Sequence, residues 1–145
     1  MSAQQREIIP DDAKKVIRDQ FFKDLKDDVA IEVYTLAGMN DQYNEAAVGL
    51  IRSLASLSPK IKASFHTVGD PQSQKRGVTR SPSVLISPDT FRMRFTGAPV
   101  GEEGRALLVS ILMASTRGVN LSEPALKRLA GLKDRRDIQV YVSPT

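Results

Sequence analysis

The chain has 145 residues, of which 41% are hydrophobic and 26% are charged, and its formal net charge is +4. This length and composition fit one globular domain with its own core and argue against a disordered or fibrous protein. Because no apolar run approaches the roughly 18–20 residues that cross a bilayer, and the first residues lack the apolar core of a signal peptide, we expect a soluble cytoplasmic protein with no membrane partner.

The spacing of apolar residues predicts alternating helices and strands. Residues 29–36 are almost continuously apolar, which is typical of a strand in the middle of a sheet. Residues 91–95 alternate aromatic or Met with Arg, which predicts a half-buried strand that forms a hairpin with the strand before it. The expected elements are a helix over 11–26, a strand over 29–36, a helix over 41–57, a strand over 60–68, a polar connection with one short helical turn over 69–80, strands over 81–86 and 91–95, a helix over 102–117, a short helix after Ser122, and a strand over 137–142.

Local signals mark the helix ends. Pro10 with two acids behind it suits a first helical turn, and the helix that follows should bury Val16, Ile17, Phe21 and Leu25. Asn40 or Asp41 can cap the second helix with a side-chain oxygen, and Ser122 can cap the last one. Gly131 predicts a left-handed residue at the end of that last helix.

Cysteine and histidine, which form many metal and nucleophilic sites, are almost absent. The sequence has no cysteine, which excludes disulfides, thiolate nucleophiles and cysteine metal sites. His66 is the single histidine and lies on the opposite strand face from Ile61, Ala63, Phe65 and Thr67. A histidine metal site normally needs two or three such ligands, so we favour a solvated strand histidine over a metal ligand.

A group of cations lies on either side of the third predicted strand. A hairpin there could gather them into a patch, but no aromatic residues alternate with them as a platform for stacking bases requires. We therefore favour a solvated rim over a nucleic-acid site. The cations are Lys75, Arg76, Arg80, Arg92 and Arg94.

One segment of the chain occurs twice. The sequence of Leu25–Tyr34 returns, with substitutions, as Leu132–Tyr141. Internal similarity indicates a structural unit that is used more than once, so the chain reads as one complete unit followed by the opening strand of another. Both tyrosines, Tyr34 and Tyr141, are expected to pack in a core.

The chain resembles tandem proteins built from thioredoxin-type units, namely the N-terminal domain of the flavoprotein subunit of alkyl hydroperoxide reductase and the protein disulfide oxidoreductases of thermophiles. Four stretches carry the resemblance, of which 95–103, with the pattern F-x-G-x-P-x-G-x-E, is the most specific; the others are 54–61, 80–83 and 140–145. The resemblance implies an α/β, thioredoxin-like fold with a central mixed four-stranded sheet flanked by helices. It also implies a boundary between a unit at 1–131 and a linker with the first strand of a second unit at 132–145.

The resemblance further implies a site at the start of the second helix. In such proteins a Cys-x-x-Cys motif lies there, and its two positions fall here on Asp41 and Asn44, so the thiol site is degenerate and no catalytic residue is expected. A groove between Gln42, Tyr43, Ser81 and Pro82 is the expected binding surface. The Ser81–Pro82 bond is expected to be cis, although a proline that simply starts a strand would serve there too.

The same resemblance implies a larger protein. In relatives, the segment matching Val142–Thr145 leads into the Cys-x-x-Cys of a second unit, so we expect a piece of a disulfide oxidoreductase or reductase whose next unit is the partner. FAD and NAD(P)H would then belong to the parent protein, and the isolated chain would be no enzyme. The alternative is a chain that ends here naturally and acts as a stand-alone peptide- or protein-interaction module, or as a homo-oligomer.

Overall fold

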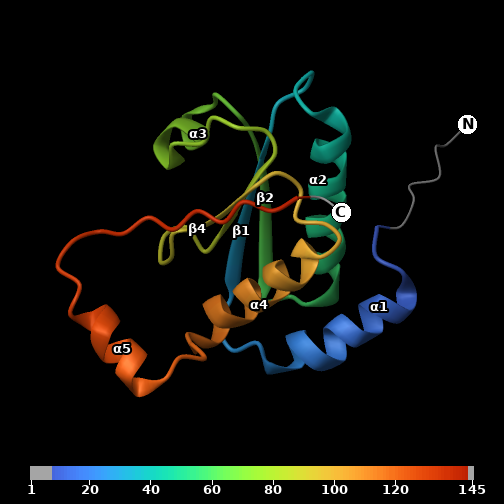
Figure 1. Ribbon diagram of the computed structural model, residues 1–145. Helices are drawn as coiled ribbons and strands as arrows, with labels where there is room; N and C mark the ends of the chain where they lie inside the picture. The colour runs from blue at the N-terminus through green and yellow to red at the C-terminus, as the bar shows by residue number, and fades with distance from the viewer. Residues whose placement is uncertain (1–7, 144–145) are drawn as a thin grey trace, which may run out of the picture.

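A four-stranded mixed sheet in the order β2-β1-β3-β4 organises the chain (Figure 1). The computed structural model describes residues 8–143. Strand β1 (Val29–Thr35) pairs parallel with β2 (Ile61–Thr67) and antiparallel with β3 (Ser83–Ile86), and β3 pairs antiparallel with β4 (Met93–Thr96). The four strands expected in the body of the sequence and the hairpin are confirmed, and the central position of β1 explains its apolar run.

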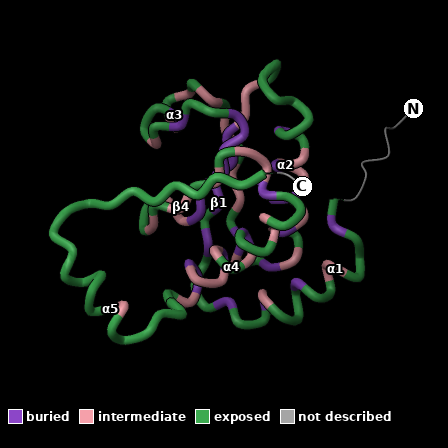
Figure 2. Tube along the Cα trace, in the orientation of Figure 1, coloured by how far each residue is buried: buried purple, intermediate pink, exposed green. Residues whose placement is uncertain are grey.

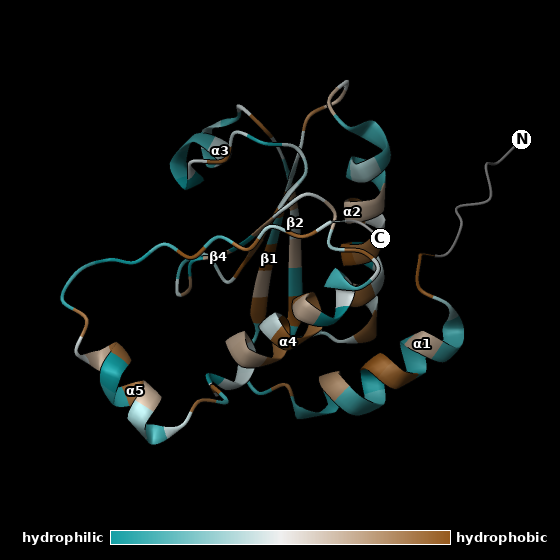
Figure 3. Cartoon of the chain, in the orientation of Figure 1, coloured by the Kyte–Doolittle hydropathy of each residue, from teal (hydrophilic) through white to brown (hydrophobic). Residues whose placement is uncertain are grey.

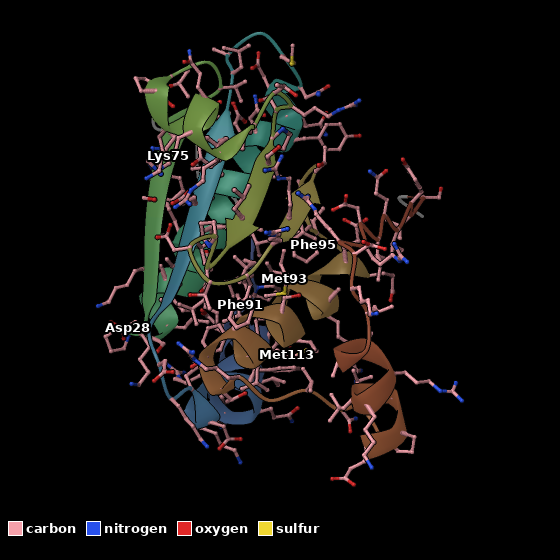
Figure 4. All side chains as sticks on the ribbon, turned by 90° about the vertical axis from the view of Figure 1, so that its left-hand side faces the viewer. Asp28, Lys75, Phe91, Met93, Phe95 and Met113 are labelled. Atoms are coloured by element: carbon pink, nitrogen blue, oxygen red, sulfur yellow. The ribbon has the colours of Figure 1, made fainter. Side chains whose placement is uncertain are left out.

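One face of the sheet holds the main core. Alternate residues of β1 meet α2 (Asp41–Leu57) and α4 (Glu103–Thr116), and Figure 3 shows hydrophobic residues concentrated on these three elements. Each fully buried aliphatic side chain stabilises the fold by about 2 kcal/mol. At the β4 edge, Phe91, Met93 and Phe95 pack against this core, and Figure 4 shows them on the side of Met113 in α4. The buried core residues of β1, α2 and α4 are Val29, Ile31, Val33, Ala47, Leu50, Ile51, Leu54, Leu107, Ile111 and Ala114.

The first predicted helix is not continuous. It is α-helical only in α1 (Asp11–Val16), continues as a π-helix in η1 (Ile17–Phe21), and ends as a 3-10 turn in η2 (Phe22–Asp24). In the π-turn the amide of Phe22 donates to the carbonyl of Ile17, so these two residues, five apart, both reach the core. The expected burial of Val16 is wrong, because this last residue of α1 is 46% exposed.

On the other face of the sheet, near one end, lies the short helix α3 (Pro71–Arg76), the helical turn expected in the 69–80 connection (Figure 1). The Asp70 carboxylate accepts a hydrogen bond from the amide of Ser73 at 2.6 Å and caps this helix. Gly77 ends it in the left-handed region with φ +62°, where a side chain would be strained. Beneath it lie Tyr34 and Leu85, so the expected core position of Tyr34 is confirmed.

The chain after α4 forms an exposed arm (Figure 2). Its helix α5 (Glu123–Ala130) is capped as expected by the Ser122 hydroxyl, which accepts from the amide of Ala125 at 3.3 Å. The prediction that a left-handed Gly131 ends this helix is wrong. Gly131 has a right-handed φ of −79°, and its amide still donates to the carbonyl of Lys127.

The repeated segment forms no strand in the described part of the arm. Residues 137–142 pair with no neighbouring strand. Without a neighbouring strand, the backbone amides and carbonyls of an extended segment can bond only to water. Tyr141 is 88% exposed, so its expected core packing is wrong. Residues 144 and 145 of the predicted second-unit segment, like residues 1–7, lie outside the described residues. Between residues 8 and 143, no helix is long and apolar enough to cross a membrane.

Candidate functional site

The start of α2 faces the turn that precedes β3. The Ser81–Pro82 bond in that turn is cis, as expected, and Pro82 is fully buried. Asp41 and Asn44, the two positions implied for thiols, lie in the first turns of α2. The fold therefore brings Asn44 to the proline turn, although Asn44 and Ser81 are 37 residues apart in the chain. Asp41 is exposed and makes no hydrogen bond to that turn in the structure.

Asn44 is the centre of this site. It is buried, and its Nδ2 atom donates to the carbonyls of Leu36 at 3.0 Å and Met39 at 2.8 Å. Its Oδ1 atom accepts a hydrogen bond from the Ser81 hydroxyl at 2.7 Å, and that hydroxyl accepts one from the amide of Leu36 at 2.7 Å. This closed network gives each polar atom of the two side chains a partner and ties the loop before α2 to the proline turn.

Neither expected cap of α2 is formed by a side chain. Asn40 has a left-handed φ of 60°, so its carboxamide turns away from the helix and donates to the carbonyl of Ser81 at 2.8 Å. Asp41 instead accepts a hydrogen bond from the amide of Gly38 at 2.8 Å and closes the loop behind it. The cap prediction is wrong because an N-cap residue needs extended backbone angles, and Asn40 does not have them.

A groove of about 650 Å³ opens between these elements. Among the residues implied as a binding surface, Tyr43, Ser81 and Pro82 line it, whereas Gln42 is exposed and does not. Tyr43 is half exposed, so the groove has an accessible aromatic wall. The other lining residues are Met39, Asn40, Thr79, Arg80, Thr96, Gly97, Ala98, Glu103 and Val142.

His66 lies away from this groove, on the α3 side of the sheet. Its ring stacks on that of Tyr34 with 5.0 Å between the centroids, and its Nε2 atom is 2.9 Å from the Ser64 hydroxyl. Within residues 8–143, no group of three or more His, Cys, Asp and Glu side chains could hold a metal ion.

A buried ion pair on the same face was not predicted. Arg76 donates from Nη2 to Glu32 at 2.8 Å and from Nε to the other Glu32 oxygen at 3.0 Å, and its Nη1 atom reaches Asp89 at 2.8 Å. Tyr34 also donates its hydroxyl to Glu32. Arg76 and Glu32 are 13% and 10% exposed, so the pair fastens α3 to β1 largely out of water.

Burial raises the pKa of the Glu32 carboxyl, but hydrogen bonds from Arg76 and Tyr34 and the charge of Arg76 outweigh burial, so this pKa lies below its usual value. Burial, and then the hydrogen bond to Glu32, raise the pKa of Tyr34. Glu32 is therefore ionised and Tyr34 neutral at neutral pH. The signal available in the sequence was an acid inside an apolar strand, because such an acid needs a buried partner.

The ion pair also changes the interpretation of the cation group. The Arg76 side chain binds Glu32 and Asp89, and its backbone carbonyl accepts a hydrogen bond from the Arg94 guanidinium at 2.7 Å. The same guanidinium donates to the carbonyl of Gly77 at 3.0 Å. The expected solvated rim is thus wrong for Arg76, whose side chain is largely out of water. Arg94 is exposed, as expected of a rim residue, and its guanidinium group also links β4 to the end of α3.

The sheet order, the helices on its faces and the cis proline before β3 define a thioredoxin-like fold. No model of a known protein family matches the chain, and no curated protein matches it. Solved structures do match. A protein disulfide oxidoreductase from Aeropyrum pernix is 23% identical with a TM-score of 0.74, over 87% of this chain and 56% of that one.

Two structures of the alkylhydroperoxide reductase protein AhpF from Enterococcus faecalis are also similar. One matches with a TM-score of 0.72 at 19% identity, over 86% of this chain and 61% of that one. The other, its NTD_N/C domain, matches with a TM-score of 0.70 at 19% identity, over 83% of this chain and 59% of that one. At these identities the likeness establishes the fold, and the chain spans less than two thirds of each protein that it matches here.

Proposed function

We propose that this chain is a redox-inactive thioredoxin-like unit of a larger thiol–disulfide protein, in which it packs against a unit that bears Cys-x-x-Cys and presents a groove to that unit's partners. The observation that carries the proposal is the state of the site where thiols would lie. Asn44 there is fully engaged in hydrogen bonds to Leu36, Met39 and Ser81, which makes it a structural side chain.

Disulfide exchange proceeds by attack of a thiolate on a disulfide sulfur. The chain contains no cysteine, so it supplies neither the attacking nor the resolving sulfur. The Asp41 carboxylate accepts a hydrogen bond from the amide of Gly38. The geometry therefore supports holding and docking and offers no group for the exchange itself.

The proposal of a larger protein is supported by the coverage of the solved relatives, which are between 56% and 61% matched along their own length. FAD and NAD(P)H would belong to other parts of that protein. The glycine-containing turn at 97–101 is followed by Glu102 and Glu103, whose carboxylates repel the pyrophosphate that such cofactors carry.

The first test is an insulin reduction assay with dithiothreitol. The chain is expected to leave the rate at that of dithiothreitol alone, while a thioredoxin in a parallel sample accelerates precipitation of the insulin B chain. Turnover by this cysteine-free chain would refute the redox-inactive assignment. The second test is the DNA beyond codon 145, where an open frame with two cysteine codons separated by two others is expected, and an immediate stop codon would contradict the larger protein.

The second candidate is a stand-alone module that binds an extended peptide in the groove. Met39 and Tyr43 favour it, because they are 44% and 50% exposed beside the proline turn. Against it, the carbonyl of Ser81 already accepts a hydrogen bond from Asn40, which leaves one lone pair for a peptide amide. A stop codon after residue 145 combined with peptide binding to the isolated chain would select this candidate over the first.

A further inference from the structure

Three exposed arginines lie on β4, beside α3 and at the groove. The apolar side chains of the β4 region turn toward α4 (Figure 4), so Arg92 and Arg94, which alternate with them, turn to the α3 side of the sheet. Arg80 lies in the connection between α3 and β3 and lines the groove. All three side chains belong to exposed residues. We call Arg80, Arg92 and Arg94 the arginine track.

The acids on this face are already bound to other groups. Arg76 binds Glu32 at 2.8 Å and Asp89 at 2.8 Å, and the carboxylate of Asp70 caps the far end of α3. Within residues 8–143, no carboxylate forms an ion pair with a member of the arginine track. The track therefore keeps an uncompensated positive charge at the surface, which attracts a partner that brings carboxylates.

Arg94 is held in place by neutral groups. Its guanidinium donates to the carbonyl of Arg76 at 2.7 Å and to that of Gly77 at 3.0 Å. These two bonds fix its orientation but leave its charge and further N–H donors available. A side chain that is ordered before binding loses less conformational entropy when a carboxylate arrives. Arg94 is thus prepared for an anionic group.

The track leads away from the groove along β4. Thr96 lines the groove, and Arg94 and Arg92 follow it at every second position of the same strand face. Neighbours in such a row are about 7 Å apart. Residues at alternate positions of an extended peptide have the same spacing, so two of its acids can meet Arg94 and Arg92 together.

The groove itself favours an apolar residue. Met39 and Tyr43 are exposed apolar walls, whereas the carboxylate of Glu103 on the same groove repels an acid. The rings of Tyr34 and His66 on the α3 side stack on each other, and Tyr34 is fully buried. They offer no platform on which bases of a single-stranded nucleic acid could stack. The surface therefore fits a protein segment better than a nucleic acid.

We propose that the groove and the arginine track bind one extended segment of a protein partner, which places an apolar or aromatic residue in the groove and acidic residues at alternate positions along the track. The inference names the kind of partner that the groove accepts, and it rests on the proposed function, in which the groove is a docking surface. Because the track is exposed, its attraction for acids weakens as salt rises.

Peptide binding tests the preference for acids. The probe is a fluorescein-labelled peptide, Tyr-Val-Glu-Thr-Glu-Thr, followed by anisotropy, and the matched probe has Gln in place of both Glu. At low salt the Glu peptide should bind about fivefold or more tightly than the Gln peptide, because two exposed ion pairs form. The difference should shrink as salt is added.

Variants test whether the track supplies the charges. Arg80→Gln with Arg92→Gln leaves the bonds between Arg94 and α3 intact and should weaken binding of the Glu peptide about fivefold, with little effect on the Gln peptide. The matched control is Arg18→Gln with Arg128→Gln, which removes the same net charge from exposed residues that do not line the groove. The control should bind the Glu peptide as the unsubstituted chain does.

Equal affinity for the two peptides, no binding of either, or equal losses in the track and control variants would overturn the inference. Tighter binding of a single-stranded oligothymidylate than of the Glu peptide would overturn the choice of a protein partner. These outcomes are separate from those for the proposed function. Equal binding of both peptides would defeat the preference for acids and leave the groove as a docking surface, whereas insulin turnover would defeat the redox-inactive assignment and leave the track.

Discussion

Replacing Arg76 by methionine tests whether the buried ion pair holds α3 on the sheet. The substitution keeps most of the aliphatic stem but leaves the Glu32 carboxylate without its two guanidinium hydrogen bonds, and it frees Asp89. Asp89 is exposed and loses little. The cost therefore comes from Glu32, which stays charged in a place where water reaches it poorly.

The magnitude follows from this burial. Removing one partner of a buried pair typically costs about 3–5 kcal/mol. Because Glu32 is 10% exposed and keeps the hydrogen bond from Tyr34, we expect the lower end, about 3 kcal/mol. A domain of this size has about 5–15 kcal/mol of stability and loses roughly 2–4 °C in Tm per kcal/mol, so Tm should fall by about 6–12 °C.

The assay is urea and thermal unfolding followed by circular dichroism. The matched control is Arg117→Met, which breaks a 3.5 Å pair with Asp27 whose side chains are 67% and 63% exposed, and which should cost less than about 1 kcal/mol. The double variant Glu32→Leu with Arg76→Met removes both charges and should recover most of the loss. If Arg76→Met costs no more than Arg117→Met, the assignment of this pair as the fastening of α3 is refuted.

Three further changes test the same reasoning. The pKa of Glu32 in the folded protein lies below the ordinary value of 4.5, so the pair stabilises the fold fully above that pH, and this stabilisation is lost as the pH falls through the lower folded pKa. Glu32→Gln should therefore weaken the dependence of the unfolding free energy on pH at the acid end. Parallel curves of unfolding free energy against pH for the variant and the unsubstituted chain would contradict this. Asn44→Ala should lower the free energy of unfolding by about 3 kcal/mol, because the carbonyls of Leu36 and Met39 and the Ser81 hydroxyl each lose a hydrogen-bond partner. A urea midpoint that does not change would refute the stabilising role of this network. Ser115→Ala should cost about 1–2 kcal/mol, because the buried hydroxyl accepts from the amide of Lys26 and donates to the carbonyl of Asp27. The control is Ser110→Ala, which removes a half-buried hydroxyl that bonds only within the same helix, to the carbonyl of Ala106.

The site shows how a thioredoxin-like fold can keep its shape without thiols. Asn44 and Ser81 join α2 to the proline turn through side-chain hydrogen bonds, and Asn40 adds a further link to the same turn. These polar contacts hold the two walls of the groove together. A well-formed groove of this kind is the premise of the proposed function.

Sequence patterns determined the parts of this protein that depend on near neighbours. Apolar periodicity predicted the four strands, the hairpin and the helices that cover them, because burial of one face repeats every two or every three to four residues. The resemblance carried by the motifs at 80–83 and 95–103 implied the fold and the cis bond at Pro82, and the lack of cysteine excluded thiol chemistry. The cap at Ser122 followed from the local chain in the same way.

Tertiary structure decided everything that depends on residues far apart in the chain. Which partner Glu32 finds depends on α3 crossing β1, and whether Asn44 stays at the surface or binds Ser81 depends on the turn before β3. The repeated segment has the pattern of β1 and yet forms no strand, because a strand exists only where another offers its amides and carbonyls. In β1 two neighbouring strands supply them, and in the described arm none does.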